Sequence, residues 1–354
     1  MSPEIFLLIT PYLRRVKIMG ATNALPVFLH ALLERAPSVE RITTWNTLSS
    51  ASLATLEKFI HLRCLDTGDA DGSVLKTIFG FRYLSELRLC LPEFDTKLEY
   101  SNGVALPALR KLSIRGNGAS IHDALGFLRG SPLTSLALLY VVGGEGSGED
   151  NWRLRIMTVS QWSNSLQILE LEELFGGDDA DEAMDPSILD PVLKIANLRH
   201  FHLRAAPTIR FTDAYFWKMA KAWPKAEHID ITAFAPYVDS SEPVVTVASL
   251  EAFATHCPNL RELSLRLNTE TTLEPMPPVL LAHGLERLYI NSPTSGDHCV
   301  IARRLVALFP YLQDVDGDDE DADHDKYTWQ DVASMVAFFR STMEDNKRRG
   351  EKQL

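Results

Sequence analysis

A group of three apolar anchors in the order L-x-x-L-x-L recurs along the whole chain of 354 residues. Seven copies are regular: Leu84/Leu87/Leu89, Leu109/Leu112/Ile114, Leu133/Leu136/Leu138, Leu166/Leu169/Leu171, Leu198/Phe201/Leu203, Leu260/Leu263/Leu265 and Leu285/Leu288/Ile290. Five are looser: Leu13/Val16/Ile18, Val39/Ile42/Thr44, Leu62/Leu65/Thr67, Ala226/Ile229/Ile231 and Leu312/Val315/Gly317. Successive copies start 22 to 34 residues apart, so the chain is an array of about a dozen short repeats.

The second and third anchors of each copy predict a short strand. They stand two residues apart, so they share one face of the strand while the residue between them points to the other face. Between strands, apolar residues recur at helical spacing, as in Leu25, Phe28, Leu29 and Leu32. No repeat can bury such a stripe alone, so repeats must stack on one another. The predicted fold is an α/β leucine-rich-repeat solenoid, a horseshoe of about 12 irregular repeats with a parallel concave sheet and convex helices.

The regular positions of six prolines indicate that this pattern is a true repeat and not a chance recurrence of leucine. In six copies a proline stands two residues before the first anchor, where it would end the preceding helix and extend the chain toward the strand. These prolines are Pro11, Pro37, Pro107, Pro224, Pro258 and Pro310.

Three segments are expected along the chain: the repeat array over 1–316, an acidic loop over 317–326, and a capping helix with a charged tail over 327–354. Val332, Met335, Val336 and Phe339 form one apolar helical stripe, which predicts that this helix closes the last repeat. Lys347–Arg349 begin the predicted tail.

The repeats resemble those of fungal F-box and leucine-rich-repeat proteins. The likeness lies in Cys257-Pro258-Asn259-Leu260-Arg261-Glu262-Leu263-Ser264-Leu265, in Leu106-Pro107-Ala108-Leu109-Arg110-Lys111-Leu112-Ser113-Ile114, and in Phe309-Pro310-Tyr311-Leu312. In that family, an N-terminal F-box engages the adaptor of a cullin-type ubiquitin ligase, and the repeats capture the substrate. The resemblance implies a substrate-recognition region that would bind such an adaptor only if an F-box precedes Met1. The first repeat begins near Leu13, which leaves no room for one after Met1. An F-box-less scaffold or adaptor, unrelated to ubiquitin transfer, is the alternative.

The formal net charge of -12 is concentrated in two acidic runs. One contains Asp178, Asp179, Asp181, Glu182 and Asp185, and the other has eight acids between Asp314 and Asp325; without these thirteen the balance is +1. A chain without a basic excess is a poor candidate for nucleic-acid binding. No apolar stretch approaches the length of a membrane span. The four cysteines show no CxxC spacing, so we expect a reducing compartment, the cytoplasm or the nucleus.

The third, fifth and seventh positions of each repeat, counted from its first anchor, should face away from the core. We call them the outward positions. Early repeats place Arg15, Lys17, Arg41 and Trp45 there. The predicted partner-binding residues on the concave face are Arg88, Lys111, Arg115, His200, His202, Arg204, His228, Glu262, Arg266, Arg287 and Tyr289. Acids are few before Asp314, so a protein partner with acidic and aromatic groups would suit this surface.

Other chemistry finds little support in the sequence. A metal site at His200, His202 and His228 is an alternative, but spacing fixes no carboxylate or thiolate beside them. The run from Asp314 to Asp325 lacks the glycine and the final glutamate of a calcium loop, and 143–148 lacks the lysine of a phosphate loop. We found no nucleophile elbow or zinc-helix motif, so neither enzymatic activity nor a cofactor is expected.

Overall fold

In the computed structural model, the chain forms two compact units, Met1–Gly177 and Asp178–Leu354. The structure describes residues 9–19, 24–70, 75, 77–78, 80–91, 106–141, 149–174, 184–205, 209–233, 245–269, 283–292, 297–317 and 328–351. Within each unit, every strand is followed by the next strand of the chain in the sheet, and all the described pairs are parallel.

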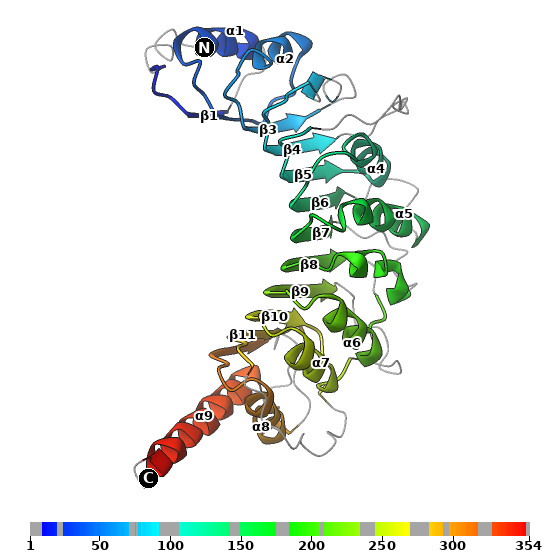
Figure 1. Cartoon of the computed structure of the whole chain (residues 1–354), viewed down its shortest axis with the longest axis vertical. Helices are drawn as coiled ribbons and strands as arrows, with labels where there is room; N and C mark the ends of the chain where they lie inside the picture. The colour runs from blue at the N-terminus through cyan, green and yellow to red at the C-terminus, as the bar shows by residue number, and fades with distance from the viewer. Residues whose placement is uncertain are drawn as a thin grey trace. The chain divides into compact units, whose positions relative to one another are not determined.

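The described part of the first unit has seven strands, with helices on one side of them (Figure 1). Its strands are β1 Arg15–Ile18, β2 Arg41–Thr44, β3 Cys64–Asp69, β4 Glu86–Leu91, β5 Lys111–Gly116, β6 Ser135–Val141 and β7 Ile168–Leu174. Its helices are α1 Leu25–Arg35, α2 Ser50–Leu56, α4 Gly118–Phe127, α5 Glu149–Val159 and the 3-10 turn η3 Ser160–Trp162.

The described part of the second unit has five strands and again carries its helices on one side (Figure 1). Its strands are β8 His200–Ala205, β9 His228–Ala233, β10 Glu262–Leu265, β11 Arg287–Ile290 and β12 Asp314–Gly317. Its helices are η4 Pro186–Leu189, η5 Val192–Lys194, α6 Asp213–Ala222, α7 Ala248–His256, α8 His298–Leu308 and α9 Trp329–Glu351.

Each of these strands contains the second and third anchors of one predicted copy. The first anchors are also buried, from Val39 to Leu312, because they precede the strand and pack under it. Even the polar anchors Thr44 and Thr67 are only 1% and 5% exposed. The prediction of a leucine-rich-repeat solenoid is confirmed: the apolar triplets form a continuous core between the sheet and the helices of each unit.

The helices follow the predicted boundaries, with one exception. Pro37, Pro224, Pro258 and Pro310 each stand two residues after the last residue of a helix, as expected from their missing N–H group. Between β7 and β8, however, the described chain has only the 3-10 turns η4 and η5. Pro191 lies between these two turns, where an α-helix would lose a hydrogen bond.

The last repeat is completed by a side chain from the cap. Its third anchor is Gly317, and a Cβ added there would lie 2.2 Å from Cδ1 of Trp329. Trp329 begins α9, is 1% exposed, and donates a hydrogen bond from Nε1 to the backbone oxygen of Ser292 at 2.6 Å. The indole therefore fills the space that a leucine fills in other repeats. Helix α9 packs on α8 and β12 and continues through Lys347–Arg349, which the sequence assigned to a tail.

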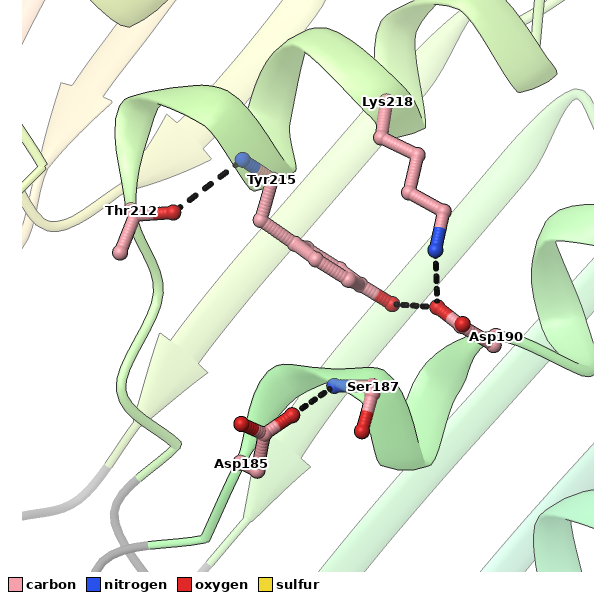
Figure 2. Close-up of polar contacts among 6 residues, drawn as sticks. All are labelled: Asp185, Ser187, Asp190, Thr212, Tyr215 and Lys218. Carbon is pink, nitrogen blue, oxygen red and sulfur yellow. Dashed lines mark hydrogen bonds and ion pairs between the residues drawn. The ribbon is translucent and has the colours of Figure 1, made fainter.

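Neighbouring repeats are also joined on the helical side by polar contacts (Figure 2). Asp190 accepts hydrogen bonds on Oδ1 from the hydroxyl of Tyr215, at 3.1 Å, and from Nζ of Lys218, at 2.7 Å. Burial and the carboxylate of Asp190 raise the pKa of Tyr215, so the phenol stays protonated and donates. Thr212 caps α6 by accepting from the backbone N–H of Tyr215 at 3.2 Å, and Asp185 caps η4.

Several predictions fall outside the described residues. These are the acidic loop over 317–326 apart from Gly317, the acidic run over 178–185 apart from Met184 and Asp185, and the glycine-rich segment 143–148. The calcium-loop alternative is described only over its first four residues, which form β12.

Candidate partner-binding surface

The outward positions of each unit lie on the face of the sheet opposite the helices, which we call the helix-free face. All eleven predicted residues occupy it or its margin. Arg88, Lys111 and Arg115 lie in the first unit and are exposed, whereas the other eight lie in the second unit. Of those eight, Arg287 and Tyr289 are exposed, and the remainder are half-buried: His200, His202, Arg204, His228, Glu262 and Arg266. The structure thus groups the residues by unit, and their role in binding stays a prediction.

A row of paired side chains crosses the second unit at the third repeat position. The rings of His200 and His228 stack with centroids 4.5 Å apart, because β8 and β9 pair these two residues. Nδ1 of His228 lies 2.9 Å from Oε2 of Glu262, whose other oxygen forms an ion pair with Arg287. Burial, followed by the nearby charge of Arg287, lowers the pKa of His228. The lowered pKa favours a neutral His228, and the carboxylate of Glu262 contacts both His228 and Arg287.

A second row runs along the fifth repeat position. Nδ1 of His202 lies 2.9 Å from Oδ2 of Asp230, its partner on β9. Burial alone would raise the pKa of Asp230, but hydrogen bonds from His202 and Ser264 outweigh it and lower that pKa. Further along, Nδ2 of Asn291 donates to Oγ of Ser264 at 3.2 Å. The face of the second unit is therefore a network of cross-strand contacts, with more carboxylates in contact than the sequence suggested.

Residues at the second repeat position extend this network, and the sequence did not single them out. Arg199 contacts Glu227 at 2.6 Å, and Arg261 contacts Glu286 at 2.7 Å. Glu227 also lies 3.5 Å from Nε2 of His200. Glu227, Arg261 and Glu286 line an open polar depression of about 410 Å³ at the edge where the chain enters the strands. A signal was present in this unit, because the charge at the second repeat position alternates in sign over four successive repeats, from Arg199 to Glu286.

The first unit presents its charges differently. Glu86 accepts from Arg41 at 2.8 Å and contacts Arg88 at 3.2 Å. In the part of the chain that the structure describes, no ion pair involves Arg15, Lys17, Lys111 or Arg115. Trp45, directly after β2, is 72% exposed, and Nζ of Lys17 lies 6.0 Å from its ring centroid. This face therefore combines unpaired cations with an exposed aromatic ring.

The histidines and two buried cysteines, Cys64 and Cys257, have side chains that can bind metals or act as nucleophiles. Across those residues, no group of three or more His, Cys, Asp or Glu side chains is arranged to hold a metal ion. Burial, aided by Glu86, raises the pKa of Cys64 to about 11, and burial raises that of Cys257 to about 12. Both thiols are therefore protonated at neutral pH and poor nucleophiles.

Comparisons with known proteins add a likeness in fold. No family model matches the chain, and no curated protein matches it. Solved structures similar to it include an internalin, InlF, from Listeria monocytogenes, with 11% identity, a TM-score of 0.40 and 86% of each chain covered. Another is the leucine-rich repeat-containing protein LegL7 from Legionella pneumophila, with 11% identity, a TM-score of 0.40, and 91% of this chain and 97% of that chain covered. Among the described helices, none has the length and apolar character needed to cross a membrane.

Proposed function

We propose that this protein is a protein-binding module whose partner contacts the helix-free face. One observation carries the proposal: the outward positions bear large polar and aromatic side chains that the core does not use. Arg287 has a side chain that is 59% exposed, and Tyr289 is 39% exposed, although both lie in a strand whose alternate residues are fully buried. Arginine and tyrosine in such exposed rows are typical anchors of protein interfaces.

Charge reversal on each unit tests this proposal. A tagged full-length chain captures proteins from a lysate, and mass spectrometry quantifies what each variant retains. One variant alters the first unit: Arg88→Glu, Lys111→Glu and Arg115→Glu. A second alters the other unit: Arg204→Glu, Arg266→Glu and Arg287→Glu. A matched control reverses exposed charges on the helical side: Lys194→Glu, Lys221→Glu and Arg303→Glu.

We expect at least one of the face variants to lose the captured partners while the control keeps them. Circular dichroism must show that all the variants stay folded. If only the helical-side control loses the partners, or if no variant does, the helix-free face is not the binding surface.

The finer form of this proposal is a substrate-recognition region of an F-box-type ubiquitin-ligase receptor. Its support is the sequence resemblance carried by 106–114, 257–265 and 309–312. The test is co-purification of the product of the complete gene with the adaptor of a cullin-type ligase. Failure to co-purify, or an upstream sequence that encodes no F-box, leaves a scaffold or adaptor unrelated to ubiquitin transfer.

A further inference from the structure

We propose that the helix-free face of β1–β5 binds an acidic segment of a partner protein and takes one of its aromatic or aliphatic side chains beside Trp45. This inference rests on the proposed function and names both the part of the face and the chemistry of the partner. It is carried by two features of the first unit: an exposed indole and a row of unpaired cations.

The indole of Trp45 lies in an unusually open place. It follows Thr44, which pairs with Ile18 on β1, and Met19 follows Ile18. Met19 is 68% exposed and Trp45 is 72% exposed, so two large apolar side chains stand at equivalent positions of adjacent repeats. An exposed tryptophan with an adjacent methionine is costly in water and favourable at an interface, where both can be covered.

The third repeat approaches this pair closely with its backbone. It has Gly68 at the seventh position, and a Cβ there would lie 2.4 Å from the backbone oxygen of Trp45. Backbone approach between β2 and β3 therefore requires glycine. The register shift that follows Asp66 places Asp69 beside Cys90 of β4.

The charges around Trp45 favour a negative partner. The outward side of β1–β5 carries six basic side chains: Arg15, Lys17, Arg41, Arg88, Lys111 and Arg115. It carries three carboxylates, Asp66, Asp69 and Glu86, of which Glu86 forms the ion pairs with Arg41 and Arg88. The remaining four cations have no ion-pair partner among the described residues, so an incoming carboxylate does not have to displace one.

A protein segment fits this surface better than a nucleic acid. The three carboxylates are interspersed among the cations, on β3 and β4, and would repel a continuous phosphate backbone. A peptide can place its carboxylates one at a time opposite Lys17, Lys111 and Arg115, with an apolar residue between them for Trp45. Lys17 near the indole adds a cation that such a carboxylate would contact.

The second unit provides the contrast. There, His228, Arg287 and Arg261 already contact carboxylates on neighbouring strands. A new carboxylate would have to compete with these contacts. The basic side chains of the second unit are thus less available than their number in the sequence suggests.

Peptide selection tests the proposal on the full chain. Random twelve-residue peptides displayed on phage are selected against the wild-type protein, and the enriched peptides are synthesised with a fluorescent label. Binding is measured by anisotropy to the wild type, to Trp45→Ser, to Lys17→Glu with Lys111→Glu, and to the helical-side control Lys194→Glu with Lys221→Glu. The single Trp45→Ser variant, at an exposed position, remains informative if the double variant unfolds.

The expected peptides carry several Asp or Glu residues and at least one aromatic or aliphatic residue. Trp45→Ser and the Lys17/Lys111 variant should each weaken binding about tenfold or more, whereas the control should change it less than about twofold. Binding should also weaken as salt increases, because the cations are exposed.

Four results would overturn the inference. The first is that selection enriches no peptide, or only peptides without acidic residues, and the second is that only the control variant loses binding. The third is that a single-stranded oligonucleotide binds this face more tightly than the peptides do. The fourth is that the protein self-associates in sedimentation experiments and the Trp45 variant abolishes this association. The last result would make a second copy the occupant. None of these results decides the proposed function, which the lysate experiment tests separately. In that experiment, a loss of partners only from the second-unit variant would support the proposed function and contradict this inference.

Discussion

The helix-free faces of the two units differ in how their charges are used. In the second unit, Glu262 contacts both His228 and Arg287, and Asp230 contacts His202, so these carboxylates already have partners on adjacent strands. In the first unit, Lys111 and Arg115 have no ion-pair partner among the described residues, and Trp45 is largely exposed. The number of charged residues on a repeat surface is therefore a poor guide to how many are available to a partner.

The same residue types serve opposite purposes in the two units. Trp45 is 72% exposed, whereas Trp329 is 1% exposed and replaces a missing core anchor. Gly68 is required by a close backbone contact, whereas a Cβ on Gly284 would meet nothing within 4 Å. Substitutions at both members of each pair should therefore have unequal effects on stability.

The largest effect is expected from Trp329→Ala. It removes a buried indole and its hydrogen bond to Ser292, so the free energy of unfolding should fall by about 3–5 kcal/mol. Urea denaturation measures this loss, and hydrogen exchange should show reduced protection in β12 and α8. Trp45→Ala is the matched control and should change the free energy by less than about 0.5 kcal/mol. Equal effects of the two substitutions would contradict the assignment of one indole to the core and the other to the surface.

Gly68→Ala should have the next largest effect. The added methyl group would meet the backbone oxygen of Trp45 at 2.4 Å, so β2 and β3 must move apart at a cost of about 1–3 kcal/mol. The control, Gly284→Ala, should be neutral or stabilise the chain by up to about 1 kcal/mol. Thermal unfolding of both variants provides the measurement, and a Gly68→Ala protein as stable as the wild type would show that the contact is not tight.

Acidification from pH 8 to pH 5 should destabilise the second unit more than the first. His283 is 5% exposed; its Nε2–H donates to the oxygen of Cys257 at 2.7 Å, and its Nδ1 accepts from the N–H of Leu285 at 3.1 Å. Burial lowers the pKa of His283 and also that of His228. Because both folded-state pKa values lie below the usual value, the stability that these groups contribute is present above about pH 6.5 and is lost as the pH falls.

Hydrogen exchange at the two pH values, read strand by strand, measures this loss. Protection should fall in β9, which contains His228, and in β10 and β11, which flank His283 in the chain; His283→Gln should weaken the pH dependence. An equal loss of protection throughout β1–β5 would argue against a role for these histidines.

The smallest change in the free energy of unfolding is expected from Glu262→Gln, with Lys111→Gln as its control. The first substitution removes the charge that joins His228 to Arg287, at a half-exposed site, and should cost about 0.5–1 kcal/mol. The second removes an unpaired cation and should stay within about 0.5 kcal/mol. Urea denaturation at low and high salt separates the two, since only the cost of Glu262→Gln should shrink as salt screens the pairs. A salt-insensitive difference would show that the contacts do not act through charge.

The sequence was sufficient to predict every described strand, because the anchors that define a strand lie within six residues of one another. It could not predict how Gly317 is compensated, since the replacement comes from Trp329, outside the repeat. Nor could it predict the pairing of His228 with Glu262, which depends on register between strands 34 residues apart in the chain. The sequence predicted which residues occupy the outward positions. It did not predict which of these residues contact an oppositely charged side chain on an adjacent strand.

The insertion of Trp329 into the last repeat also has a mechanical consequence. A load applied to the C-terminal end of the chain passes along α9 before it reaches β12, and α9 is held there by an indole inserted where Gly317 leaves space. We expect the first rupture under tension to be the extraction of this ring, ahead of any separation of β12 from β11. The helix would then detach before the strands that precede it unfold.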